Sequence, residues 1–211
     1  EFLSGSPLPL TDGVIGPDGA MYFLTGGRRL ESDLYRITAI NENAIAAKKD
    51  TTTINEANQL RRSLEQYHEL KKGAVDFAWP YLKHEDRFVR YAARIAIEHQ
   101  PVAEWQERAI NETDPQSLSQ AMIALARHGK SVLKDKMIQS LVKVDFAKLS
   151  PSEKIDLIRA FEVLIFRMGK PVGATRDQLV AYLDKQYPSS SNMLDRELSK
   201  VLVYMNAPGV L

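Results

Sequence analysis

The strongest constraint on the fold is a helical pattern that returns along most of the chain. From Glu56 onward, apolar residues recur at three- and four-residue intervals, which is the period of an amphipathic α-helix. Shifting the sequence by 28 residues places Asp86 on Asp114, and shifting it by 40 places Leu125 on Ile165. A unit that returns at such intervals predicts helix pairs stacked into an α-solenoid, with an irregular helical bundle as the alternative.

Capping residues divide this region into separate helices. Thr53 and Glu56 have the spacing of a capping box, in which each side chain satisfies a free backbone donor at a helix start. The segment Ser150-Pro151-Ser152-Glu153 combines the same motif with proline at the first helical position. A helix is therefore expected to begin at each of these two sites.

Periodicity also predicts what the helices bury. The first one is expected to end at Gly73 and to bury Leu60, Leu64, Tyr67 and Leu70. The helix after Asp86 is expected to bury Val89, Ala92, Ala93, Ala96 and Ile97. A further helix is expected to start at Pro101. The Ser150 helix is apolar on more than one side, with Phe166 among its apolar residues, so neighbours are expected to cover both of its faces.

The first forty residues follow a different pattern. Two turn sequences, Pro17-Asp18-Gly19 and Gly26-Gly27-Arg28-Arg29, separate short alternating stretches, which predicts about three antiparallel strands. So few strands are too little sheet to stand alone comfortably. Residues 1–40 are therefore expected to be a partial β-propeller blade or a β-hairpin segment. The polar residues 41–55 are expected to form a linker, and residues 56–211 the helical repeat domain.

Composition argues against several classes of function. The 28 basic and 27 acidic residues leave a net charge of +1, so binding of nucleic acid has no whole-chain electrostatic support. The chain has no cysteine, which excludes disulfides and thiolate zinc sites within it. Apolar runs such as residues 163–166 are far shorter than the roughly 20 residues that cross a bilayer, so no membrane insertion is expected.

The sequence contains no recognisable catalytic constellation. The four histidines, His68, His84, His99 and His128, lie on different predicted elements and lack the spacing of metal ligands. There is also no nucleophile elbow, phosphate loop or dinucleotide fingerprint. Accordingly, no catalytic, cofactor-binding or metal-binding residue is expected, and this segment by itself is not expected to be an enzyme.

The helix after Asp86 carries the candidate site residues. Arg87, Arg90 and Arg94 lie at positions i, i+3 and i+7, with Tyr91 between them. They form either a solvated helix face or a contact surface for an acidic partner or a phosphate. Asp86 and Arg90 lie four residues apart, which permits a local ion pair.

The pattern Asp86-x-x-Val89-Arg90-x-x-Ala93 resembles the second-helix signature of HEAT repeats. In that family the Asp and the Arg help to tie adjacent repeats together, so the resemblance implies an inter-repeat link through Asp86 and Arg90. The expected fold class is therefore mainly α: a HEAT-like α-solenoid with a short N-terminal antiparallel β segment of about three strands.

A second resemblance spans both halves of the chain. Residues 7–12, 16–23, 26–28 and 34–37 resemble the last β-propeller blade of large bacterial proteins similar to soluble glucose/sorbosone dehydrogenases. Residues 87–94 and 194–209 resemble their helical part. In those proteins HEAT-like repeats follow the propeller, and a cytochrome c type haem domain often comes next. Their cofactor and catalytic residues lie on earlier blades, so none is carried onto this chain. The resemblance implies a periplasmic or secreted location.

Two functions fit these patterns better than a third, nucleic-acid binding through the stripe of Arg87, Arg90 and Arg94. The first is a non-catalytic scaffold or docking segment whose partners are the other domains of a larger exported dehydrogenase-like protein. The alternative is a free-standing solenoid whose concave face binds a protein or a peptide. Neither function involves nucleic acid or a cofactor held by this segment.

Overall fold

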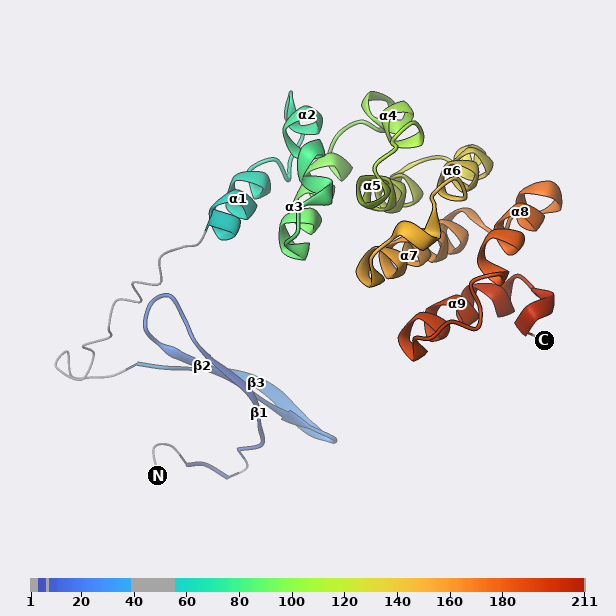
Figure 1. Ribbon diagram of the computed structural model, residues 1–211. Coiled ribbons are helices and arrows are strands. Elements are labelled where there is room, and N and C mark those ends of the chain that lie inside the picture. Colours follow the sequence, from blue (N-terminus) through green and yellow to red (C-terminus); the bar gives the residue numbers. More distant parts are fainter. Residues whose placement is uncertain (1–3, 7, 39–55, 211) are drawn as a thin grey trace. The chain divides into compact units, whose positions relative to one another are not determined.

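The structure, a computed structural model, describes residues 4–6, 8–38 and 56–210. The chain divides into two compact units, Glu1–Thr53 and Ile54–Leu211. The predicted linker at residues 41–55, which includes the capping residue Thr53, lies outside the described residues. The first unit contains a small sheet and the second unit is helical, so the described chain is mainly α, as predicted (Figure 1).

The first unit contains a three-stranded antiparallel sheet in the order β1-β2-β3. The strands are β1 (Leu10–Ile15), β2 (Met21–Gly27) and β3 (Leu30–Ile37). Gly19 lies in the first turn with a φ of 76°, a conformation that glycine adopts without steric cost. The predicted strands and the predicted turn at residues 17–19 are therefore confirmed.

Apolar side chains lie on both faces of this sheet. The register pairs Phe23 with Tyr35 on one face, where the ring centroids are 4.9 Å apart, and Leu24 with Leu34 on the other. Phe23 is buried, but several large apolar side chains are exposed: Leu10, Val14, Ile15, Leu24, Leu30 and Leu34. Exposed apolar surface of this kind marks faces that commonly bind other parts of a protein.

The second unit is built from helices joined by short turns. In the described residues its α-helices are α1 (Glu56–Glu65), α2 (Ala74–Ala78), α3 (Arg87–Glu98), α4 (Gln106–Ile110), α5 (Pro115–His128), α6 (Lys134–Leu141), α7 (Pro151–Met168), α8 (Gly173–Asp184) and α9 (Asn192–Tyr204). Single 3-10 segments lie between some of these helices, among them η2 (Trp79–Lys83) and η3 (Val102–Glu104).

The helices of this unit form two rows (Figure 1). The lower row in Figure 1, here called the front row, contains α1, α3, α5, α7 and α9, and each of these helices contacts its neighbours in the row. The upper row, here called the back row, contains α2, α4, α6 and α8. In this row α4 contacts α6 and α6 contacts α8, and every helix of the row also contacts the front row. From α2 onward, consecutive helices therefore alternate between the rows.

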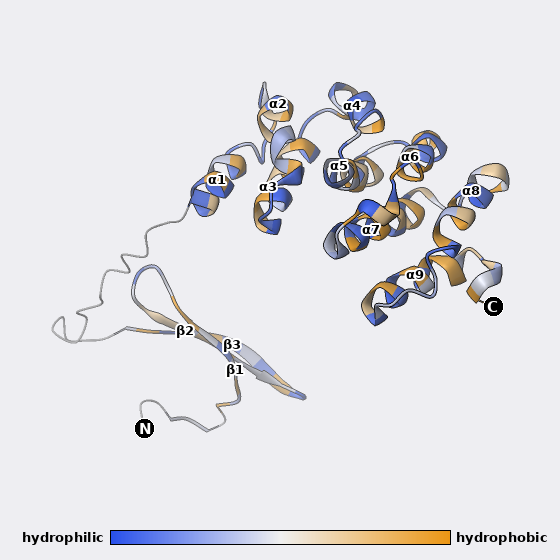
Figure 2. Cartoon of the chain, in the orientation of Figure 1, coloured by the Kyte–Doolittle hydropathy of each residue, from blue (hydrophilic) through white to orange (hydrophobic). Residues whose placement is uncertain are grey.

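The hydrophobic core of the helical unit lies between the two rows as one cluster of buried residues. Trp105 and Phe161 are its largest fully buried side chains. The helices carry hydrophobic and hydrophilic residues on different sides (Figure 2), which is the pattern of helices that bury one face. The five residues predicted to be buried on α3 are all buried: Val89, Ala92, Ala93, Ala96 and Ile97.

Residues that are aligned by displacing the sequence by 28 or 40 positions occupy equivalent positions in the helices. Asp86 and Asp114, which lie 28 residues apart, cap the N-termini of α3 and α5, and each carboxylate accepts hydrogen bonds from backbone N–H groups of the first turn. Gly129 and Gly169, which lie 40 residues apart, are the C-caps of α5 and α7. The capping box predicted at Ser150 is confirmed.

The first helix is shorter than the sequence predicts. α1 ends at Glu65, and Leu70 is 75% exposed instead of buried. The reason lies in the side chain of Gln100, whose Oε1 accepts a hydrogen bond from Lys71 N at 3.0 Å and whose Nε2 donates to Glu69 O at 2.8 Å. These tertiary hydrogen bonds satisfy backbone groups that a longer helix would pair internally.

One further helix prediction holds only in part, and another is wrong. As expected, α7 has neighbouring helices on both sides, α5 and α9. Phe166 is 84% exposed, because α7 packs against α5, α6 and α9 and part of its surface stays open. The helix expected from Pro101 is divided into η3 and α4 at Trp105, whose φ of −134° is not helical. The buried indole of Trp105 donates a hydrogen bond to Gln100 O at 3.2 Å, which holds the ring in the core at this break.

Candidate functional site on the front-row helices

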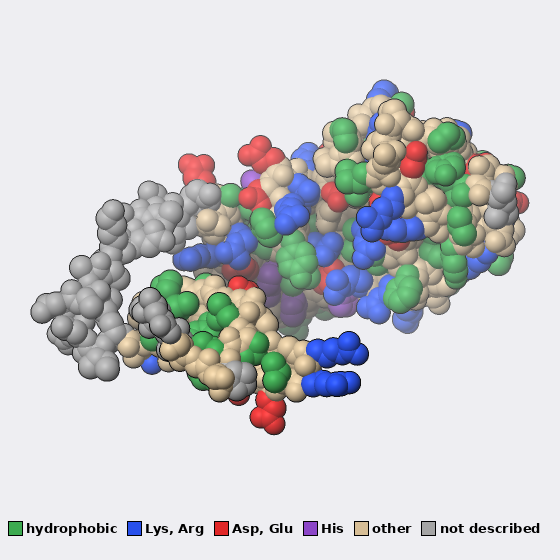
Figure 3. Space-filling model, turned by 90° about the horizontal axis from the view of Figure 1, so that it is seen from below, with side chains coloured by type: hydrophobic (Ala, Val, Ile, Leu, Met, Phe, Trp, Pro, Cys, Tyr) green, Lys and Arg blue, Asp and Glu red, His purple; other side chains and the backbone are tan. Residues whose placement is uncertain are grey.

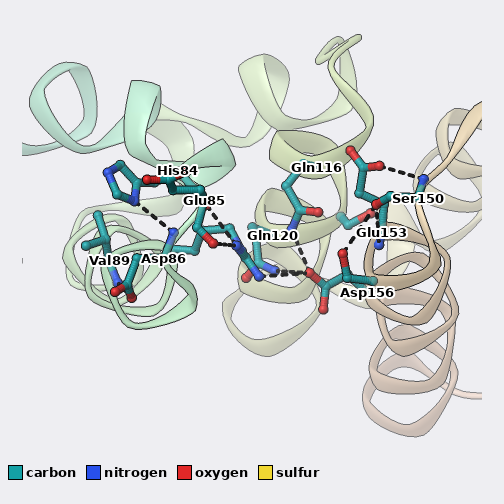
Figure 4. A network of polar contacts seen from close by, with 12 residues as sticks. His84, Glu85, Asp86, Val89, Gln116, Gln120, Ser150, Glu153 and Asp156 are labelled. Carbon is teal, nitrogen blue, oxygen red and sulfur yellow. Dashed lines mark hydrogen bonds and ion pairs between the residues drawn. The ribbon is translucent and has the colours of Figure 1, made fainter. Parts of the chain in front are cut away.

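A polar network crosses the front row at one carboxylate (Figure 4). Oδ2 of Asp156, on α7, accepts a hydrogen bond from Gln116 Nε2 of α5 at 2.6 Å and lies 3.5 Å from Arg90 Nη2 of α3. Gln120 Nε2, one turn further along α5, lies 3.5 Å from the same oxygen. Side chains from three successive front-row helices therefore meet at Asp156.

Arg90 also holds the loop that precedes α3. Its Nη1 donates to the backbone oxygens of His84 at 2.8 Å and Glu85 at 2.9 Å, and its side chain is only 15% exposed. Among the described residues, Asp86 does not form the ion pair with Arg90 that its spacing permits, since its carboxylate caps α3. Arg90 thus reaches another helix, whereas Asp86 stabilises the start of its own.

A second cluster surrounds the carboxylate of Glu98, at the C-terminal end of α3. Its oxygens lie 3.2 Å from Arg94 Nε, Arg127 Nε and His128 Nε2, and its side chain is 4% exposed. Arg94 Nη1 donates to Gln120 Oε1 at 3.2 Å, which joins this cluster to the first one. Burial lowers the pKa of the Arg94 guanidinium, and the nearby Glu98 carboxylate opposes that effect.

The predicted interaction face of α3 does not form one basic surface. The side chains of Arg90 and Arg94 are 15% and 12% exposed, and both belong to the polar clusters. Arg87 and Tyr91 are exposed, Tyr91 to 55%. The expected stripe is therefore divided: two of its arginines hold the helices together, and two of its residues face solvent.

A groove lined by arginines lies between α5 and α7, beside the Glu98 cluster. This α5–α7 groove has a volume of about 350 Å³ and is lined by Arg94, Ile123, Arg127, Arg159, Val163, Phe166 and Arg167. No acidic residue of the described chain lines it, so positive charge surrounds an apolar floor. The sequence predictions missed this groove, although the 40-residue shift that aligns Leu125 with Ile165 also aligns Arg127 with Arg167. That alignment is the signal that points to it.

A second groove lies between α7 and α9 and shares one wall with the first. This α7–α9 groove has a volume of about 560 Å³ and is lined by Glu162, Ile165, Phe166, Gly169, Lys200, Val201 and Tyr204. Phe166 lines both grooves, and the Tyr204 side chain at the other wall is 56% exposed. Figure 3 views the molecule from the side on which the front row lies in Figure 1, and there basic and hydrophobic side chains are interspersed.

Three of the histidines have structural partners. His68 Nε2 lies 2.9 Å from a backbone oxygen of α3, His84 Nδ1 accepts a hydrogen bond from Asp86 N at 3.0 Å, and His128 Nε2 lies 3.2 Å from Glu98. In residues 8–38 and 56–210, no three or more His, Cys, Asp or Glu side chains are grouped so as to hold a metal ion. Within the same residues, no helix has both the length and the hydropathy needed to cross a bilayer.

Comparison with known proteins assigns no family. No protein-family model matches the chain, and no curated protein or solved structure shows significant similarity to it. The resemblances to HEAT repeats and to glucose/sorbosone dehydrogenase-like proteins therefore stay predictions.

Proposed function

We propose that this chain is a non-catalytic scaffold, a HEAT-like α-solenoid that serves as a docking segment of a larger exported dehydrogenase-like protein. The observation that carries this proposal is the meeting of α3, α5 and α7 at Asp156. A partly buried carboxylate with partners on two other helices fixes their spacing, because moving one helix would leave a charged or polar group without its partner. A fixed spacing between helices is what a docking scaffold requires.

The packing of the rows supports the solenoid part of the proposal. Each front-row helix contacts the next one, and the N-caps Asp86 and Asp114 recur after 28 residues. Repeat arrays are stabilised mainly by contacts between neighbouring repeats, so a chain of nearest-neighbour contacts is the expected pattern. Hydrogen bonds such as that between Gln116 and Asp156 would then be interactions between repeats.

The N-terminal sheet supports a place in a larger protein. Its exposed apolar residues include Val14 on one face and Ile15 on the other. In a β-propeller the blades are small antiparallel sheets that pack face to face around a channel, so both faces of a blade are covered. Under this proposal β1, β2 and β3 belong to a last blade, and the periplasmic or secreted location follows from the same resemblance.

The alternative is a free-standing module that binds a protein or a peptide through its front row. The observation that favours this function is Phe166, which is 84% exposed where two grooves meet. Exposed aromatic residues beside a hollow are typical of protein interaction sites. In both versions the chain acts by binding.

Two measurements test the proposal. A dye-reduction assay on the full chain with sugars and redox cofactors should show no turnover above the buffer control, and cofactor-dependent sugar oxidation would contradict a non-catalytic role. Hydrogen exchange should show the amides of α3, α5 and α7 opening together as one cooperative unit. Independent opening of the three helices would argue against a scaffold fixed at Asp156.

A further inference from the structure

We propose that the front face of α5, α7 and α9 binds an acidic segment of a partner protein, which places a large apolar side chain against Phe166. This inference rests on the docking role proposed above and adds to it the site and the chemistry of the partner. The site consists of the α5–α7 groove and the α7–α9 groove, which meet at Phe166. Both grooves are built on helices that pack directly against each other.

The apolar part of the site is an aromatic ridge between two hollows. The side chain of Phe166 is 84% exposed, and apolar residues lie beside it in each groove, among them Val163 on one side and Val201 on the other. An apolar side chain that enters either groove covers one side of the phenyl ring and is itself removed from water. Removing both apolar surfaces from water favours binding.

The charges around the ridge select an acidic partner. The side chain of Arg167 has neither an ion pair nor a hydrogen bond with any residue that the structure describes, although it lines the α5–α7 groove. Arg127 shares the Glu98 carboxylate with Arg94 and His128, and Arg159, 64% exposed, pairs with Glu162, whose side chain is 15% exposed. Guanidinium groups bind carboxylates through two parallel hydrogen bonds, so free donors at Arg167 suit an Asp or Glu side chain.

A polypeptide fits this surface better than a nucleic acid does. Nucleic acids bind along continuous rows of cations, because successive phosphates each need a positive charge. Further along the front row, Arg90 and Arg94 are already paired with Asp156 and Glu98. The positive charge is therefore confined to a short stretch around an apolar floor, and a short acidic and apolar segment matches it.

The partner chemistry is tested by panning a random peptide library on the full chain. We expect the enriched peptides to carry Asp or Glu next to a Phe, Trp, Leu or Ile. A synthetic consensus peptide is then titrated with the full chain by fluorescence anisotropy, next to a version with its apolar residue changed to Ser. The Ser version should bind at least about tenfold more weakly.

The location of the site is tested with matched variants on the exposed surface. Phe166→Ser and Arg167→Glu should each weaken binding of the consensus peptide by about tenfold or more. Phe88→Ser and Arg87→Glu are the controls, because Phe88 is 58% exposed, Arg87 is exposed on α3, and neither lines the two grooves. Both controls should bind within about twofold of the unchanged chain. Circular dichroism checks that all four variants are folded.

Three results would overturn the inference. They are the absence of any enriched peptide, enrichment of peptides without acidic residues, and binding that Phe166→Ser and Arg167→Glu leave unchanged. Tight binding of single-stranded DNA that depends on the same two residues would show that the ligand of this site is a nucleic acid and not an acidic segment. None of these results concerns sugar oxidation or the joint opening of α3, α5 and α7, so the scaffold proposal fails or survives separately.

Discussion

The single residue Asp156 connects three helices. Its Oδ2 atom contacts Gln116 and Gln120 on α5 and Arg90 on α3, while its own backbone belongs to α7. Arg90 is 15% exposed and Asp156 is 27% exposed, so water screens this ion pair less than it screens a pair at the surface. Loss of the carboxylate would leave the arginine partly buried without its counter-charge.

Removing the Asp156 carboxylate is therefore expected to destabilise the helical unit. Asp156→Ala should lower the free energy of unfolding by about 1 to 3 kcal/mol, because Arg90 and Gln116 both lose a partner. Asp156→Asn should cost less, since the amide oxygen still accepts the hydrogen bond of Gln116. Urea unfolding followed by circular dichroism measures both changes.

Asp76→Asn is the matched control for this prediction. The Asp76 side chain is 87% exposed and pairs with Arg108, so its loss should change the free energy of unfolding by less than about 0.5 kcal/mol. Equal effects of Asp156→Ala and Asp76→Asn would show that the network contributes no stability.

A second prediction at the residue scale concerns the carboxyl group of Asp18 in the first turn of the sheet. Hydrogen bonds from Arg36 and Tyr22 lower the pKa of Asp18 from 3.8 to about 2. Because the folded pKa is the lower one, the stabilisation is present above pH 3.8 and is lost as the pH falls towards 2. An NMR titration of the side-chain carboxyl carbon should give a midpoint near 2.

Arg36→Gln supplies the comparison for this titration, because Arg36 is the largest cause of the shift. In this variant the titration midpoint of the Asp18 carboxyl group should move back towards 3.8. The side chains of Arg36 and Asp18 are 54% and 38% exposed, so water and ions reach the pair and added salt should also raise the midpoint. A midpoint that stays the same in Arg36→Gln would show that the ion pair does not persist in solution.

At the scale of single elements, the end of α1 depends on a residue from a distant part of the sequence. Gln100 is 4% exposed, and its amide bonds Lys71 N, Glu69 O and Ala96 O. Gln100→Ala should lower the free energy of unfolding by about 1 to 3 kcal/mol, since three backbone groups lose their hydrogen bonds to this buried amide. It should also speed amide exchange between residues 66 and 73.

The matched control is Gln66→Ala, because Gln66 is exposed in the same loop and only its backbone oxygen bonds a side chain there. This change should leave both the stability and the exchange of the loop close to those of the unchanged chain. Faster exchange in Gln66→Ala than in Gln100→Ala would contradict the assigned role of Gln100.

Helix starts were predictable from the sequence, whereas this helix end was not, and the difference is physical. An N-cap uses atoms within one turn, so the capping box at Ser150 could be identified from neighbouring residues alone, and Asp86 and Asp114 cap their helices through equally local contacts. The end of α1 depends on a hydrogen bond between residues that are 29 positions apart. No local pattern encodes such a bond.

The candidate site could likewise be predicted from the sequence only in part. Helical spacing correctly placed Arg90 and Arg94 on one stripe of α3, but the acceptors that remove them from the surface lie on α7 and α5. The α5–α7 groove combines residues from three helices, and the exposure of Phe166 depends on where α9 packs. Such features follow from the packing of several helices, which periodicity in one segment does not specify.

At the scale of the whole molecule, the two units are expected to fold separately. The core cluster of the helical unit runs from Leu64 to Ala207 and includes no residue of the sheet. A chain that begins at Ile54 should therefore keep the core of this unit intact. Its melting temperature should change by less than about 2 °C, which corresponds to less than 1 kcal/mol for a domain of this size.

The sheet should behave in the opposite way. A peptide of residues 1–38 keeps the stacked pair Phe23 and Tyr35 but exposes apolar side chains on both faces, so no cooperative unfolding transition is expected for it. Thermal unfolding of both fragments and of the full chain by circular dichroism makes the comparison. A drop of more than about 5 °C in the helical fragment would mean that the sheet contributes more than 1 kcal/mol to the helical unit. The sheet would then be a structural part of the scaffold, and not a segment that another domain covers.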